Sequence, residues 1–94
     1  MRVIVAELTG FTATYPVYYV DTEKAYEEQL GRVGLPNFGE TVVNYCNQMN
    51  CDQVNICCDI RFTINFAKEI LTVAKTKYNQ NNIKVEVNGN EIFA

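Results

Sequence analysis

The chain has 94 residues, of which 48% are hydrophobic, and its net charge is −3 at pH 7 with a pI of about 4.8. This length allows one domain, residues 1–94, and the apolar fraction is that of a folded globular protein. The mild negative charge argues against non-specific nucleic-acid binding, which depends on a cationic surface.

The N-terminal segment has too short an apolar run before Glu7 for a signal peptide. No apolar segment approaches the ~20 residues that are needed to span a bilayer. We therefore expect a cytoplasmic protein with reduced cysteines and no contact with a membrane.

Two β-strands are predicted at the N-terminus. Residues Arg2–Thr9 are rich in valine and isoleucine on both faces, which indicates a strand inside a sheet that is covered on both sides. Residues Thr14–Val20 form the second strand. Pro16 cannot donate a ladder hydrogen bond, so this strand either lies at an edge or begins at the proline. We expect the two strands to pair as an antiparallel hairpin.

Two helices are predicted next. A helix-start signal at Asp21 predicts a short, acidic surface helix over Thr22–Leu30. Asn37, followed three residues later by Glu40, resembles a capping box and predicts a second helix over Phe38–Met49.

The centre of the sequence predicts a buried strand, Gln53–Cys58, then a long helix, Phe62–Tyr78, then a strand, Ile83–Val87. This unit should join parallel strands through a right-handed crossover. The apolar residues of the long helix spread over an arc of about 200°, twice the ~100° stripe that a surface helix needs. The helix therefore requires two covering surfaces, which are the sheet and either another helix or a partner chain.

Asn88-Gly89 predicts a terminal hairpin with a type I′ turn. Its register would place Glu86 opposite Glu91, so either water or a cation from elsewhere should separate the like charges. The predicted fold is α+β, or α/β with antiparallel edges. It has one small mixed sheet, the order β-β-α-α-β-α-β-β and a long helix packed on the sheet.

The sequence contains no histidine, and its glycines form no phosphate-binding loop. The commonest general base and metal ligand are therefore missing, and we favour a protein without enzymatic activity. The four cysteines lack the paired Cys-x-x-Cys spacing of zinc sites, so we expect no metal and no cofactor. Small core residues are the simpler interpretation of Cys46, Cys51, Cys57 and Cys58.

Three carboxylates are the candidate catalytic residues. Glu7, Asp21 and Asp59 lie near predicted strand ends, where α/β proteins place ligands, and together they could hold Mg²⁺ in a nuclease. The favoured interpretation is structural, as two caps and one exposed strand residue. The run Ile4–Glu7 with a later strand-end aspartate resembles ribonuclease H-like folds over a small part of the chain, and no family is assigned.

Two groups of side chains are candidates for binding. One is a basic ridge on the long helix, which could contact an anion or an acidic partner: Arg61, Lys68 and Lys75. The other is a tyrosine group on the second strand, of which at least one side chain must face outward: Tyr15, Tyr18 and Tyr19. The structural alternatives are a solvated helix face and packing of the hairpin on the sheet.

We therefore expect a small interaction module that binds another protein as an inhibitor or adaptor, and that forms a homodimer. Such small acidic domains are typical of accessory proteins of phages and other mobile elements. One alternative is a small protein whose oligomer buries an anionic ligand such as a nucleotide among the tyrosine group and the basic ridge. The other is the Mg²⁺-dependent nuclease.

Overall fold

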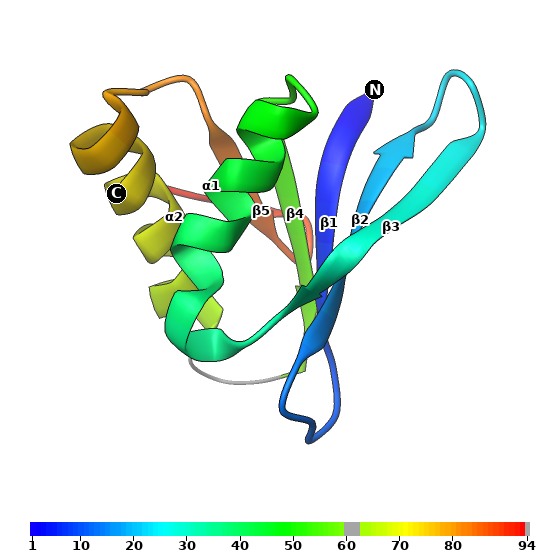
Figure 1. The fold of residues 1–94 in the computed structure, drawn as a ribbon, viewed down its shortest axis with the longest axis horizontal. Coiled ribbons are helices and arrows are strands. Elements are labelled where there is room, and N and C mark those ends of the chain that lie inside the picture. Colours follow the sequence, from blue (N-terminus) through cyan, green and yellow to red (C-terminus); the bar gives the residue numbers. More distant parts are fainter. Residues whose placement is uncertain (60–62, 94) are drawn as a thin grey trace.

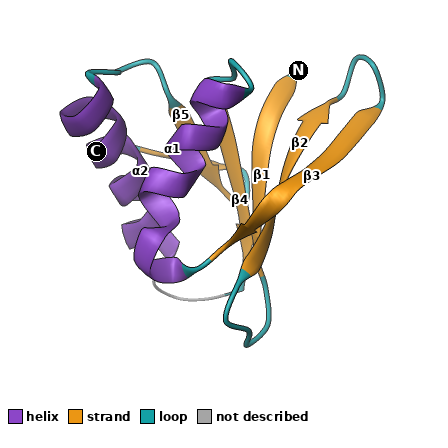
Figure 2. Ribbon diagram, viewed as in Figure 1, coloured by secondary structure: helices purple, strands orange, loops and turns teal. Residues whose placement is uncertain are grey.

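A computed structural model describes residues 1–59 and 63–93. These residues form one mixed six-stranded sheet with helices on one side of it (Figures 1 and 2), so the predicted fold class is confirmed. The strands are β1 (Arg2–Leu8), β2 (Tyr15–Asp21), β3 (Tyr26–Val33), β4 (Gln53–Cys58), β5 (Lys84–Val87) and β6 (Asn90–Ile92). The helices are a short 3₁₀ turn, η1 (Leu35–Asn37), and two α-helices, α1 (Phe38–Gln48) and α2 (Thr63–Tyr78).

The strand order is β3-β2-β1-β4-β5-β6. Strand β4 runs parallel to both β1 and β5, whereas the β1–β2, β2–β3 and β5–β6 pairs are antiparallel. The predicted N-terminal hairpin and the parallel strands around the long helix are confirmed. The edge position considered for the second strand is wrong, because β3 pairs with the outer side of β2. The strand begins at Tyr15, one residue before Pro16.

The short helix predicted over Thr22–Leu30 does not form. The carboxylate Oδ1 of Asp21 accepts hydrogen bonds from the main-chain N–H groups of Glu23 (3.1 Å) and Lys24 (3.3 Å), and Ala25 has a positive φ of 50°. These bonds close a tight turn, and the chain returns along β2 as strand β3. Asp21 therefore caps a hairpin turn rather than a helix.

Helix α1 begins where the sequence predicts, directly after η1, but without the predicted capping box. Asn37 makes no side-chain capping hydrogen bond. Glu40, the other half of the expected box, instead forms an ion pair with Lys77 of α2. An inter-helix contact has thus replaced a local one.

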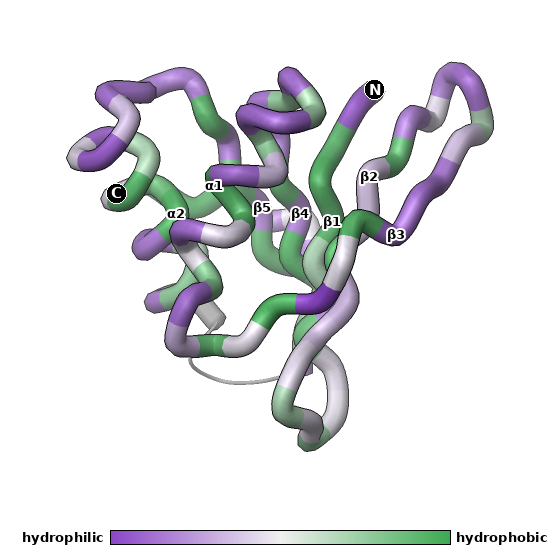
Figure 3. The backbone as a smooth tube through the Cα atoms, in the orientation of Figure 1, coloured by the Kyte–Doolittle hydropathy of each residue, from purple (hydrophilic) through white to green (hydrophobic). Residues whose placement is uncertain are grey.

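The hydrophobic core lies between the helices and one face of the sheet. Strand β1 contributes Ile4, Ala6 and Leu8 to this face, and all three are fully buried. Figure 3 shows hydrophobic residues along β1 and β4, and hydrophilic residues along much of β3. The prediction that β1 is covered on both sides is wrong, because both helices lie on the same side (Figure 2). On the opposite face, Val3 is buried, and Val5 and Glu7 are half-buried.

The terminal hairpin has the predicted type I′ turn, with φ values of 49° at Asn88 and 88° at Gly89. Glu86 pairs with Glu91, as the predicted register requires. The expected cation is Lys84, whose Nζ lies 3.9 Å from Glu86 and 3.6 Å from Glu91.

Candidate binding groove

Helix α2 has two covering surfaces within the chain. The sheet side buries Ala67, Ile70 and Ala74 completely. Helix α1 covers a second side, where the rings of Phe38 and Phe66 meet edge to face with centroids 5.7 Å apart. The prediction of a second covering surface is confirmed, and the structure selects another helix of the same chain for most of it.

One flank of α2 is left partly open. Four residues of this flank follow one another at intervals of four, three and four positions. Such intervals place side chains along one side of an α-helix. Two of them are apolar and two are basic: Ile64, Lys68, Leu71 and Lys75. Ile64 is 49% exposed and Leu71 is half-buried, so this flank extends the apolar arc beyond what α1 and the sheet cover.

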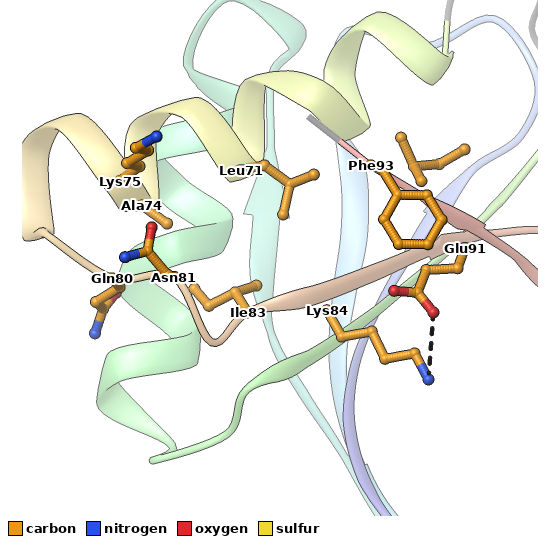
Figure 4. Close-up of a pocket in the computed structure, with 10 residues that line it drawn as sticks. Leu71, Ala74, Lys75, Gln80, Asn81, Ile83, Lys84, Glu91 and Phe93 are labelled. Carbon is orange, nitrogen blue, oxygen red and sulfur yellow. Dashed lines mark ion pairs between the residues drawn. The ribbon is translucent and has the colours of Figure 1, made fainter.

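A groove of about 280 Å³ lies between this flank and the β5–β6 hairpin (Figure 4). Its apolar lining comes from the helix, from the start of β5 and from the end of β6: Leu71, Ala74, Ile83, Ile92 and Phe93. Phe93 directly follows the short edge strand β6 and is 71% exposed. A phenylalanine left in water beside an apolar groove is typical of a contact surface.

The charged residues that line this groove are two lysines and one glutamate: Lys75, Lys84 and Glu91. Lys68 lies about two helical turns from Lys75 on the same stripe. Among the described residues neither lysine has an ion-pair partner, whereas Lys84 is already held by two glutamates. One residue of the predicted basic ridge, Lys75, therefore lines a groove, and Lys68 lies on the same flank of α2 beyond it. Arg61 lies outside the described residues.

The tyrosine group does not form a common surface. Tyr15 and Tyr19 are buried on the helix side, where the Tyr15 hydroxyl donates to the carbonyl of Gly10 (3.2 Å) and the Tyr19 hydroxyl accepts from Arg2 Nε (2.7 Å). Tyr18 alternates to the open face and is half-buried. The prediction that at least one of Tyr18 and Tyr19 faces away from the core is confirmed for Tyr18, but the three tyrosines do not share one contact surface. They also lie on β2, away from the lysines of α2, so one chain does not combine them into the expected anion site.

The three candidate catalytic carboxylates do not come together. Glu7 pairs with Cys57, and Asp59 follows β4 at the same end of the sheet. Asp21 pairs with Arg2 at the opposite end of β1, roughly 16 Å from Glu7 at about 3.3 Å per residue. One Mg²⁺ ion needs all its ligands at about 2.1 Å, so these three residues cannot share an ion.

None of the four cysteines forms a disulfide within the described residues. Burial raises the pKa of Cys46 to about 12, with smaller effects from Cys51 and Asp52. Burial also raises the pKa of Cys57, and the nearby Glu7 adds to this effect. Within residues 1–59 and 63–93, no group of three or more metal-binding side chains comes together. A raised thiol pKa disfavours the nucleophilic thiolate, which fits structural cysteines.

Compared with known proteins, the chain matches no protein-family model and no curated protein sequence. None of the helices formed by the described residues is both long and apolar enough to cross a membrane.

Three exposed aromatic residues were not identified from the sequence. Phe11, in the loop between β1 and β2, is fully exposed and had no predicted role. Tyr26, which is 46% exposed, was placed inside the short helix that does not form. Phe93 had no predicted role, although its position after an alternating strand could have indicated an exposed edge. The groove itself depends on how the terminal hairpin sits against α2, which no local pattern specifies.

Proposed function

We propose that this protein is a small interaction module, and that it binds a segment of another protein chain in the groove between α2 and β6. The observation that carries this proposal is the exposed Phe93 beside a partly apolar groove that Lys75 also lines. Lys68 lies about two helical turns away on the same flank of α2, and among the described residues neither lysine forms an ion pair. Binding of this kind suits an inhibitor or adaptor, because it needs no catalytic group.

The groove favours a partner segment with an apolar or aromatic side chain flanked by carboxylates. Burying such a side chain against Leu71 and Phe93 would contribute about 1.5–3 kcal/mol. Each exposed ion pair with Lys68 or Lys75 would contribute less than about 1 kcal/mol. The apolar anchor would therefore supply most of the affinity, and the lysines would orient the partner and speed its association.

A second copy of this chain carries such a segment. Tyr26 begins strand β3 at the other edge of the sheet, and Glu27 and Glu28 follow it, both exposed. The Tyr26 hydroxyl donates to Glu28 (2.7 Å), which holds the aromatic ring beside the carboxylate. Because the groove and this hairpin are different surfaces, the contact would be head to tail rather than self-complementary.

The solution mass measured by light scattering over a range of concentrations tests this self-association. We expect a mass that rises above that of one 10.7 kDa chain and falls back to it in Phe93→Ser. Phe11→Ser is the matched control, because Phe11 is also an exposed phenylalanine but lies in the β1–β2 loop. A wild-type mass of one chain throughout, or an equal effect of both substitutions, would contradict binding of a second copy.

A further inference from the structure

Among the described residues the sheet has two unpaired edges, strand β3 on one side and strand β6 on the other. An edge strand directs alternate main-chain N–H and C=O groups away from its sheet, where they can pair with another strand. The self-association proposed above brings the first residues of β3 to the groove beside β6 of a second copy. The two edges therefore meet in the same contact.

The two edge strands run in opposite directions. Strand β3 has the direction of β1, because each of them is antiparallel to β2. Strands β4 and β5 share this direction, and β6 is antiparallel to β5. A second copy that lies beside the first in the same orientation therefore presents β3 as an antiparallel neighbour of β6. The helices of both copies then lie on the same side of one sheet, as they do within each copy (Figure 2).

The registers of the two edges also match. One row of paired residues crosses the whole sheet: Glu28, Tyr19, Ile4, Val54, Val85 and Ile92. The next row begins at Gln29 and ends at Glu91. If the sheet continues without an offset, Glu28 of the second copy lies opposite Ile92. The next pair is then Gln29 opposite Glu91. A shift of two residues would instead place Glu27 opposite Glu91, and like charges in that position are unfavourable.

The side chains of this pairing reach the groove. Tyr26 and Glu28 lie on the helix side of the sheet, because their partners in β2 are buried there. Both are exposed, because the helices of their own chain leave the first half of β3 uncovered. In the continued sheet they lie beside Ile92, on the side where Leu71 and Lys75 line the groove. Pairing of the edges thus brings an aromatic ring and a carboxylate to that groove.

We propose that β3 of a second copy adds to β6 as an antiparallel strand, so that one sheet continues from copy to copy. This inference rests on the proposed self-association and specifies its main-chain geometry. Each added copy leaves its own β6 edge free, so the assembly grows head to tail without closing into a dimer.

Substitution of Glu91 tests the main-chain pairing. Val87 and Asn90 form the hydrogen-bonded pair that closes the two-residue turn, so Glu91 directs its N–H away from β5. Glu91→Pro removes this N–H without removing a hydrogen bond within the chain, which an edge strand tolerates. Glu91→Gln is the matched control, because it loses the same charge and keeps the N–H. By light scattering, Glu91→Gln should associate like the wild type, whereas Glu91→Pro should keep the mass of one 10.7 kDa chain.

Hydrogen exchange of the wild-type protein measures the same contact without a substitution. We expect the Glu91 amide to exchange about tenfold or more slowly as the protein concentration rises, while the amide of Thr12 in the β1–β2 loop keeps its rate. Equal association of the two Glu91 variants, or an unprotected Glu91 amide, would overturn strand pairing. Association that Phe93→Ser still abolishes would then leave the proposed groove contact intact. A wild-type mass of one chain at every concentration would overturn both.

Discussion

Asn88 connects the terminal hairpin to the central strand of the parallel part of the sheet. Its side-chain Oδ1 accepts from the N–H of Cys58 and its Nδ2 donates to the carbonyl of Cys58, both at 3.0 Å. Its main-chain N–H donates to the carbonyl of Ile56 (2.9 Å), and its φ is 49°. One residue therefore supplies both the left-handed turn conformation and the attachment of β5–β6 to β4.

Substitution of Asn88 separates these two contributions. Asn88→Ala should lower the free energy of unfolding by roughly 2 kcal/mol, because it removes the side-chain hydrogen bonds and because alanine tolerates the left-handed region less well than asparagine does. Asn88→Gly should lower it by about half as much, since glycine tolerates this conformation. Urea unfolding measures both values. If both variants lose the same free energy of unfolding, the left-handed backbone conformation at residue 88 does not contribute to the loss in Asn88→Ala.

Turns and caps could be predicted from the sequence where the preferences of one or two adjacent residues decide them. The Asn88-Gly89 turn and its register follow from dihedral preferences that belong to the dipeptide. The capping signal at Asp21 was also recognised, but the same side-chain bonds close a helix or a hairpin turn. Which of the two forms depends on whether the following residues find a strand to pair with.

Strands and helices were predictable where they carry their own periodicity. Helix α2 shows a continuous apolar arc, and β4 is a compact apolar run. Strand β3 has neither, because it is an edge strand whose side chains are mostly exposed. Strand β3 forms because it pairs with β2. This pairing depends on the whole sheet and cannot be read from residues 26–33 alone.

The packing of α1 against β3 gives a prediction at the element scale. A Cβ added at Gly31 would lie closer to the Tyr45 hydroxyl than a van der Waals contact allows, although the backbone there would accept a side chain. Gly31→Ala should therefore lower the free energy of unfolding by about 1–3 kcal/mol.

A double-mutant cycle tests the cause of this loss. Tyr45→Phe removes the hydroxyl, while the ring carbon that carried it would lie 3.5 Å from the new Cβ, which is an ordinary contact. Gly31→Ala should then cost much less in the Tyr45→Phe background, and denaturant unfolding of the four proteins gives the coupling. Additive effects would show that α1 does not pack on β3 through this pair.

At the scale of the whole molecule, the surface of α2 was only partly predictable. Its wide apolar arc indicated two covering surfaces, and the basic residues Lys68 and Lys75 were recognised from their spacing. Phe93 lies at the same groove as Lys75 because of the position of the β5–β6 hairpin beside α2. The candidate groove therefore depends on long-range contacts that no local pattern contains.

The most direct test of the groove places a photo-cross-linking phenylalanine analogue at Phe93, with the same analogue at Phe11 as the control. Both side chains are exposed, but only Phe93 borders the groove. On irradiation in the cells that make the protein, we expect a covalent adduct with a second chain, either this protein or another, from position 93 only. Lys75→Glu should reduce that adduct. No adduct at 93, or equal adducts at 93 and 11, would contradict a binding groove between α2 and β6.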